Sequence, residues 1–139
     1  TNFCYIMCIA EKERLMPTPI MIKAGPVVLE GELFDSPTAR AVTDILPIKT
    51  TFNVWGDEFY FEIPVDMPLD ETATTEVKTG DIGYWPIGRA IAIFFGPTPL
   101  SSGPDPIPAS EVNIVGRIKG DARELVEAKS EKRILIQKR

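Results

Sequence analysis

The chain of 139 residues is long enough for one domain with one hydrophobic core, and its 44% hydrophobic and 25% charged content is typical of a globular protein. Its net charge of -5, without a long run of Lys or Arg, argues against a nucleic-acid backbone or an anionic membrane surface as partner, because both attract concentrated positive charge. The absence of histidine excludes Ser-His-Asp and Cys-His catalytic sites and His-rich zinc sites.

The N-terminal residues 1–15 are expected to be an extension outside the fold, which leaves residues 16–139 as a single domain. Residues 3–10 are apolar but far fewer than the roughly 20 that span a bilayer, with no basic region before them and no clear cleavage site after them. Both cysteines, Cys4 and Cys8, lie here, which predicts neither a disulfide framework nor a structural zinc site and favours a reducing cytoplasm. No metal or cofactor is predicted.

Short apolar runs separated by Gly and Pro turns follow, a pattern typical of a β-sandwich or a small barrel. In residues 58–63 the apolar Phe59 and Phe61 alternate with polar neighbours, as a half-buried strand requires. Residues 90–95 are apolar on both faces, so we expect a helix or another segment to cover the outer face of that strand. Eight strands are predicted, at about residues 20–24, 27–34, 48–55, 58–63, 81–85, 89–95, 111–118 and 132–138.

Two helices are predicted between these strands. The first begins at the cap Ser36 with Pro37 in its first turn, and Pro47 prevents its continuation. A shorter helix is expected after Gly120, with Asp121 as its cap. The apolar contacts are expected from Ala39, Val42, Ile45 and Leu46 in the first helix, and from Leu125 and Val126 in the second.

The last predicted strand, residues 132–138, is expected to pair with an early strand. Ile134 and Ile136 alternate with Leu135 and Gln137, which supplies one inward face. An unpaired apolar edge here would promote aggregation.

A candidate binding site surrounds the predicted turn at residues 86–88. Tyr84, Trp85 and Arg89 flank this turn, with Thr98 expected opposite, at one mouth of a barrel. An Arg side chain can grip a carboxylate in a fork, and Tyr or Trp can stack on a planar ligand, so a small planar or anionic ligand is expected if the site binds one. The alternative is that both rings pack the turn and the Arg side chain is solvated.

Other polar groups each leave two interpretations open. The Pro-rich loop after Phe95 is either a binding loop or a plain connector. Glu58 and Glu62 are expected to lie on a solvated outer face, the alternative being an acid/base pair. Asn113, inside a strand, is expected to form hydrogen bonds to a neighbouring loop. The acidic residues Asp66, Asp70 and Glu71, in a predicted loop without EF-hand spacing, are expected to be solvated, the alternative being a hard-cation site.

Four stretches together resemble one family, the atypical cyclophilin-like barrels, which are small prokaryotic proteins whose function is not established. The resemblance implies a mostly β fold, with a closed eight-stranded barrel and one or two short helices. It does not imply prolyl isomerisation, because cyclophilins use an arginine, a glutamine, aromatic residues and a histidine, whereas this chain has no histidine and its sole glutamine is Gln137. The stretches are residues 55–61, 80–86, 94–99 and 112–116.

The leading hypothesis for function is a domain that binds a small molecule or a peptide at the barrel rim. The alternative is an enzyme, either a divergent peptidyl-prolyl isomerase or a hydrolase that uses carboxylates or Arg in place of His. A structural or oligomeric partner module is the third possibility, and the sequence leaves the oligomeric state open. A concave pocket with converging polar groups would favour a binding site or an active site, whereas an exposed apolar patch would favour the partner module.

Overall fold

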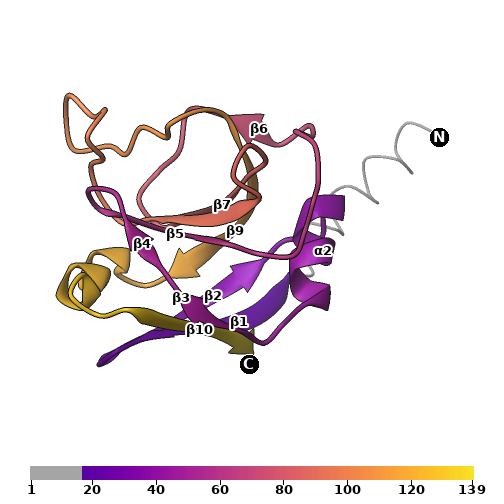
Figure 1. The fold of residues 1–139 in the computed structure, drawn as a ribbon, viewed down its shortest axis with the longest axis horizontal. Coiled ribbons are helices and arrows are strands. Elements are labelled where there is room, and N and C mark those ends of the chain that lie inside the picture. Colours follow the sequence, from indigo (N-terminus) through magenta and orange to yellow (C-terminus); the bar gives the residue numbers. More distant parts are fainter. Residues whose placement is uncertain (1–16) are drawn as a thin grey trace.

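The computed structural model describes residues 17–139, which form a ten-stranded antiparallel sheet and two helices (Figure 1). The fold is therefore mostly β, as predicted. The extension predicted at residues 1–15 lies outside the described residues, so its separation from a domain at residues 16–139 stays a prediction. No helix within residues 17–139 is long and apolar enough to cross a membrane.

The first and last strands form one side of the sheet. β1 (Thr18–Ala24) and β2 (Val27–Leu33) make a hairpin, and β10 (Arg133–Lys138) lies between β1 and β3 (Ile48–Thr51). Ile136 of β10 pairs with Ile22 on one side and with Ile48 on the other, and all three side chains are buried. The predicted pairing of the last strand with an early strand, through an inward face that includes Ile134, is confirmed.

The central strands form the other side of the sheet. β9 (Val112–Lys119) joins β2 to β7 (Asp81–Trp85), and β8 (Ala90–Phe94) and β5 (Glu58–Glu62) continue the sheet to β4 (Asn53–Val54). The full order is β3-β10-β1-β2-β9-β7-β8-β5-β4, with β6 (Ala73–Thr74) paired to β9 off this path.

The closed eight-stranded barrel implied by the resemblance is not confirmed, because β3 and β4 stand at the two ends of the order and are not paired with each other. Each of the eight predicted strands has a counterpart, but the one predicted at residues 48–55 changes partner at Phe52. β3 pairs with β10 before that residue, and β4 pairs with β5 after it. The short β6 gave no recognisable alternation and was not predicted.

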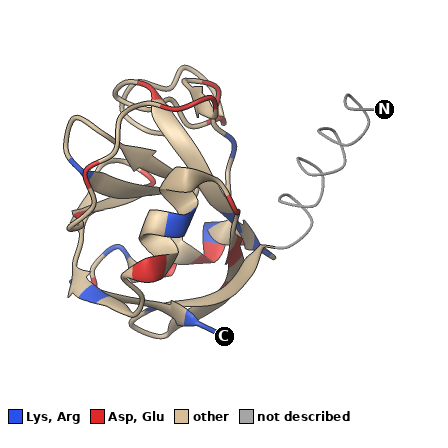
Figure 2. Cartoon of the chain, turned by 90° about the vertical axis from the view of Figure 1, so that its right-hand side faces the viewer, with Lys and Arg blue, Asp and Glu red and all other residues tan. Residues whose placement is uncertain are grey.

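Both predicted helices occur. α2 (Pro37–Asp44) begins at Ser36, whose Oγ accepts a hydrogen bond from the Ala39 backbone N–H at 3.2 Å. It packs against β2 and β9 on the side that faces the viewer in Figure 2. The second helix, η1 (Ala122–Ala128), is a 3-10 helix capped by Asp121. Its Leu125 is fully buried as predicted, but the predicted contact through Val126 is wrong, since that side chain is 37% exposed.

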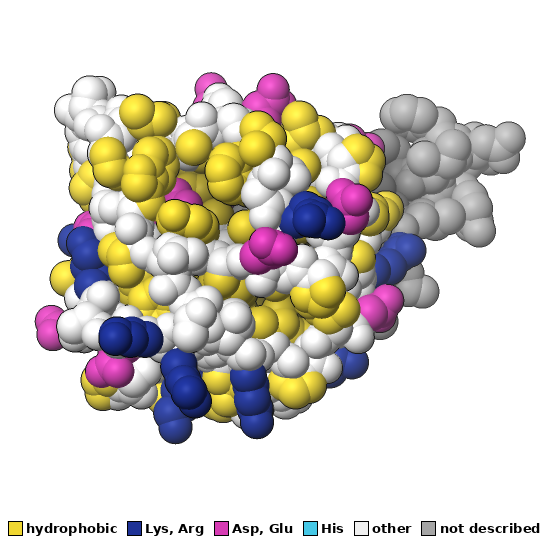
Figure 3. Space-filling model, in the orientation of Figure 1, with side chains coloured by type: hydrophobic (Ala, Val, Ile, Leu, Met, Phe, Trp, Pro, Cys, Tyr) yellow, Lys and Arg dark blue, Asp and Glu magenta, His cyan; other side chains and the backbone are white. Residues whose placement is uncertain are grey.

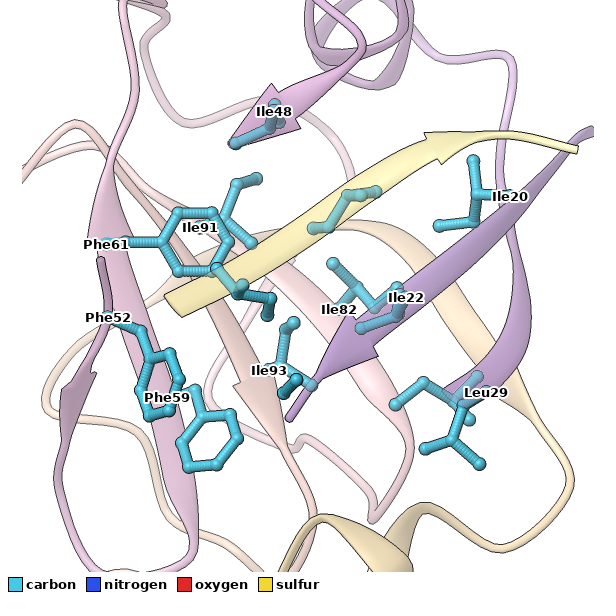
Figure 4. Close-up of a cluster of buried hydrophobic side chains, with 14 of the residues drawn as sticks. Ile20, Ile22, Leu29, Ile48, Phe52, Phe59, Phe61, Ile82, Ile91 and Ile93 are labelled. Carbon is cyan, nitrogen blue, oxygen red and sulfur yellow. The ribbon is translucent and has the colours of Figure 1, made fainter. Parts of the chain in front are cut away.

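The main hydrophobic core fills the space that the sheet encloses. Side chains from β1, β3, β5, β7 and β8 point toward one another there (Figure 4). Phe59 lies between two other rings, with its centroid 4.1 Å from that of Phe52 and 4.7 Å from that of Phe95. The alternation predicted for residues 58–63 is thereby confirmed for the inward-facing side chains.

A second, smaller cluster lies on the opposite face of β8. Ile91 and Ile93 face the main core, whereas Ala92 and Phe94 pack with Val112 on the outer face. Every residue of β8 is buried, which confirms that another segment covers this strand. Part of that cover is residues 96–111, which contain no helix or strand.

Candidate functional site

A cavity of about 220 Å³ lies between the outer face of the β5–β8–β7 part of the sheet and the segment 96–111. Figure 3 shows hydrophobic side chains gathered over the upper half of the face, where Figure 1 places this segment. The cavity wall is mostly aromatic and aliphatic, with one carboxyl group. Its lining residues are Trp55, Glu58, Tyr60, Trp85, Ala92, Phe94, Pro108, Ala109 and Val112.

Strand register explains why this face is hollow. Glu58 pairs with Phe94, and the next outward-facing pair is Tyr60 with Ala92. Ala92 in turn pairs with Gly83 of β7. Val112 and Phe94 fill the space above Gly83, where a Cβ would lie 2.9 Å from Val112 Cγ2. Ala92 carries only a methyl group, so the cavity lies above it, between the larger side chains of this face and the covering segment.

Glu58 supplies the carboxyl group of this cavity. Its side chain is 7% exposed, and its Oε1 has no hydrogen-bond partner among residues 17–139. Burial raises the pKa of the Glu58 carboxyl from 4.5 to about 8, so the group is mostly protonated at neutral pH. The predicted solvated outer face is therefore wrong for Glu58, because the segment 96–111 covers it, although Glu62 four residues later is exposed.

Two tryptophans form opposite parts of the wall, and they are the only tryptophans of the chain. The indole Nε1 of Trp85 donates a hydrogen bond to Ser110 Oγ at 2.6 Å, which holds the end of the covering segment against β7. On its other side the ring is packed against Gly88, where a Cβ would come within 2.6 Å of the ring. Trp85 is thus fixed in one orientation before any ligand arrives.

The covering segment is held by its own hydrogen bonds. Thr98 Oγ1 donates to the Ile107 carbonyl at 2.5 Å, and the Thr98 backbone N–H donates to Ser101 Oγ at 3.0 Å. Ser101 Oγ donates to the Asp105 carbonyl at 2.7 Å. This Pro-rich loop is a connector, because it joins β8 to β9. It is also part of the cavity wall, because its Pro108 and Ala109 line the cavity.

The turn before Glu58 fastens the covering segment to the sheet. The Asp57 backbone N–H donates to the Pro97 carbonyl at 2.9 Å, and its side chain binds Arg123 at 2.7 Å and Lys129 at 2.9 Å. Burial raises the pKa of the Asp57 carboxyl, but hydrogen bonds and charges from Lys129 and Arg123 outweigh burial and hold this pKa below 3.8. Adjacent carboxyls therefore differ, with Asp57 paired and ionised and Glu58 unpaired and mostly neutral.

The four residues predicted to bind a ligand do not share one cavity. Tyr84 is fully buried in the main core, where its hydroxyl donates to the Val65 carbonyl at 2.5 Å and accepts from the Met67 N–H at 3.2 Å. Trp85 lines the cavity described above, and Thr98 organises the covering segment. Arg89 lies elsewhere, in a wider hollow lined by Glu62, Ile63, Pro64, Val65, Asp66 and Arg89.

A separate polar network near α2 is internally satisfied. Asn113 is fully buried, accepts a hydrogen bond from the Asp70 N–H at 2.8 Å and donates to the Pro68 carbonyl at 2.9 Å. Asp70 also accepts from Thr38 Oγ1 at 2.7 Å. The predicted hydrogen bonding of Asn113 to a neighbouring loop is confirmed. Across residues 17–139 no three His, Cys, Asp or Glu side chains lie close enough together to hold a metal ion.

Comparisons with known proteins found matches that cover most of the chain. A family model described as Cyclophilin-like matches residues 18–137. The chain is similar to the solution structure of the hypothetical protein AF2241 from Archaeoglobus fulgidus, with 36% identity and a TM-score of 0.73 over 88% of this chain and 95% of that chain. No curated protein matches it significantly.

A second solved structure shares the fold alone. It is the structure of McbB in complex with tryptophan, with 15% identity and a TM-score of 0.64. The match covers 86% of this chain but 44% of that one, so the chain spans less than half of its length.

Proposed function

Because the chain belongs to the cyclophilin-like family, as its sequence motifs predicted, we propose that it binds a small molecule in the cavity beneath residues 96–111. The size of the cavity favours a small molecule over a peptide, since about 220 Å³ is below the roughly 300–1,000 Å³ of sites for drug-sized ligands. Its mostly apolar wall with a few polar groups, Glu58 among them, is the usual composition of such a site.

The single observation that carries this proposal is the unpartnered Oε1 of Glu58. A buried polar atom without a hydrogen bond costs about 1–3 kcal/mol, and such atoms are rare in folded proteins. The neighbouring Asp57 forms two ion pairs at the same turn, so the lack of a partner is particular to the Glu58 carboxyl, which lines the cavity. A ligand that hydrogen-bonds to Glu58 would remove this cost on binding.

Filling the cavity tests this proposal. We expect Ala92→Leu to occupy the floor of the cavity and to abolish binding, while the fold is retained because the new side chain enters empty space. Tryptophan fluorescence is the measurement, because both tryptophans line the cavity and no other tryptophan adds signal.

The matched control is Arg89→Ala, which changes the other hollow and is expected to bind as the parent does. If Ala92→Leu bound every fluorescence hit as tightly as the parent, the cavity would not be the site. If Arg89→Ala alone lost binding, the site would lie at the other hollow, as the sequence suggested.

A second candidate function is an enzyme in which Glu58 transfers a proton. One observation favours it, the pKa of about 8, which lies close to neutral pH, where general acid–base catalysis is most efficient. Turnover of any screened substrate should then decrease by at least about a hundredfold in Glu58→Gln, with a bend in the pH profile near the pKa of this carboxyl.

We further propose that residues 48–54 close the sheet into a barrel as one continuous strand. The Phe52 N–H donates to the Lys132 carbonyl at 3.0 Å, and the Trp55 N–H donates to the Glu58 carbonyl at 2.9 Å. The segment is thus bonded to both open sides of the sheet, one after the other. Slow hydrogen exchange at both amides supports closure, and fast exchange at either argues against it.

A further inference from the structure

Resting on the proposed binding function, we propose that the cavity selects a small aromatic amine, which binds as its ammonium ion against the carboxylate of Glu58. The geometry that carries this is a single buried carboxyl with an unpartnered oxygen inside an aromatic wall. The ligand supplies the positive charge that the protein does not.

The charges around Glu58 exclude an anionic ligand. Among residues 17–139 no Lys or Arg lines the cavity, and two cations near this turn, Arg123 and Lys129, are both bound to Asp57. In Figure 3 the other cations of this face lie mostly along its lower edge, away from the hydrophobic upper half. An anion would therefore meet a carboxyl without a compensating charge, whereas a cation would gain a charge-assisted hydrogen bond. This replaces the planar anion expected at Arg89.

The wall favours a flat cation over a compact one. Trp55, Tyr60 and Trp85 present ring systems around the space that Glu58 faces, and Phe94 lies beside Glu58 on the next strand. Aromatic faces attract cations, and they stack on planar groups. A ligand that joins an aromatic ring to an amine uses both parts of the wall.

Binding must move one proton, because the empty site holds Glu58 mostly protonated. If the amine arrives uncharged, the O–H bond of Glu58 breaks and an N–H bond forms on the ligand. If it arrives as ammonium, the Glu58 proton leaves to solvent. Among the other titratable groups nearby, Tyr60 lines the cavity and Asp57 stays ionised beside its two cations, while β8 and residues 96–111 contribute only uncharged side chains to the wall.

The test is calorimetric titration with three probes of similar shape: phenethylamine, the neutral phenethyl alcohol and the anion hydrocinnamate. Because an alkylammonium keeps its proton well above pH 8, we expect the Kd of the amine to fall about tenfold per pH unit up to about pH 8 and then to level off. Proton release, read from buffers of different ionisation enthalpy, should approach one per amine bound below that pH and zero for the alcohol.

Two variants separate the contribution of the Glu58 charge to amine affinity from the contribution of the cavity's shape. Glu58→Gln should lose at least about tenfold in amine affinity near pH 8, so that the amine no longer binds more tightly than the alcohol. Glu62→Gln, an exposed carboxyl four residues along the same strand, is the matched control and should follow the parent protein. If Glu58→Gln fails to fold, the pH dependence of the amine Kd in the unaltered protein still tests the proposal.

The outcomes distinguish this inference from the function on which it rests. Alcohol binding as tight as amine binding, with no dependence on pH, would overturn the ligand class and leave the binding function intact. Binding of hydrocinnamate alone would likewise overturn it. Binding of none of the three probes to the parent protein would overturn the ligand class and the proposed function together.

Discussion

At the scale of single residues, Glu58 makes the protein less stable as pH rises. Its pKa is about 8 in the folded protein and near 4.5 in the unfolded chain, so between these values the folded state holds a proton that the unfolded chain has lost. The free energy of unfolding therefore falls through this window, by about 1 kcal/mol per pH unit. Glu58→Gln, which stays neutral, should match the parent near pH 4.5 and exceed it by roughly 3 kcal/mol near pH 8.

Urea unfolding of both proteins across this pH range measures the difference. Glu62→Gln should keep the parent's pH dependence, because that carboxyl is exposed. A constant difference between Glu58→Gln and the parent at every pH would mean that Glu58 does not hold its proton in the folded state.

Glu58 also shows what the residue pattern of a single strand does not determine. Alternation in β5 correctly placed Phe59 and Phe61 in the core and Glu58 on the opposite face. Alternation says only that a side chain points away from the core, not whether another segment covers it. The cover comes from residues 96–111, which have no periodic pattern, so the burial of Glu58 could not be predicted from its own strand.

At the scale of elements, the turn at Gly56 and Asp57 holds the covering segment over the cavity. Gly56 has a φ of 61°, and a Cβ there would lie 2.9 Å from Thr98 Cα, so the segment can approach closely only because this residue is glycine. Asp57→Asn keeps the shape but removes the charge that binds Arg123 and Lys129. We expect a loss of about 1 kcal/mol near neutral pH, since both cations are more than a third exposed and partly screened.

The stability lost in Asp57→Asn should become smaller as the pH falls. Asp57 has a lowered pKa in the folded protein, so its contribution is present above 3.8 and disappears as pH falls through the folded value. Thermal unfolding of Asp57→Asn and the parent should therefore differ near neutral pH and converge in acid. Equal stability near neutral pH would show that the two ion pairs contribute nothing to folding.

Most elements were predictable because their signals are local. Ser36 and Pro37 set the start of α2, and Asp121 sets the start of η1, from side chains within the same few residues. The split of residues 48–55 at Phe52 depends on which strands lie on either side, and β6 is only two residues long, so neither left a local pattern. That the four residues of the predicted rim site do not share one cavity has a similar reason, since Tyr84 faces the core while Trp85 faces outward.

At the scale of the whole molecule, the C-terminal strand joins two parts of the sheet that the chain order separates. β10 lies between β1 and β3, and Ile134 and Ile136 lie in the core. Truncation after Gly120 removes this strand and η1, which leaves the edges of β1 and β3 unpaired and opens the core to water. We expect the truncated chain to lose cooperative thermal unfolding and to aggregate. An unchanged melting temperature would mean that β10 does not hold the sheet together.

The placement of Glu58 in a half-open, mostly apolar cavity suited to a ligand is tested by the pKa of its carboxyl group. Carbon NMR of protein labelled at the glutamate carboxyl carbons, with Glu58→Gln to assign the resonance, measures this pKa in the free protein. The structure predicts a midpoint of about 8, because burial disfavours the charged form and no cation contacts Oε1 within the described residues. A midpoint near 4.5 would show that the group is hydrated, and would contradict both the burial of Glu58 and the function built on it.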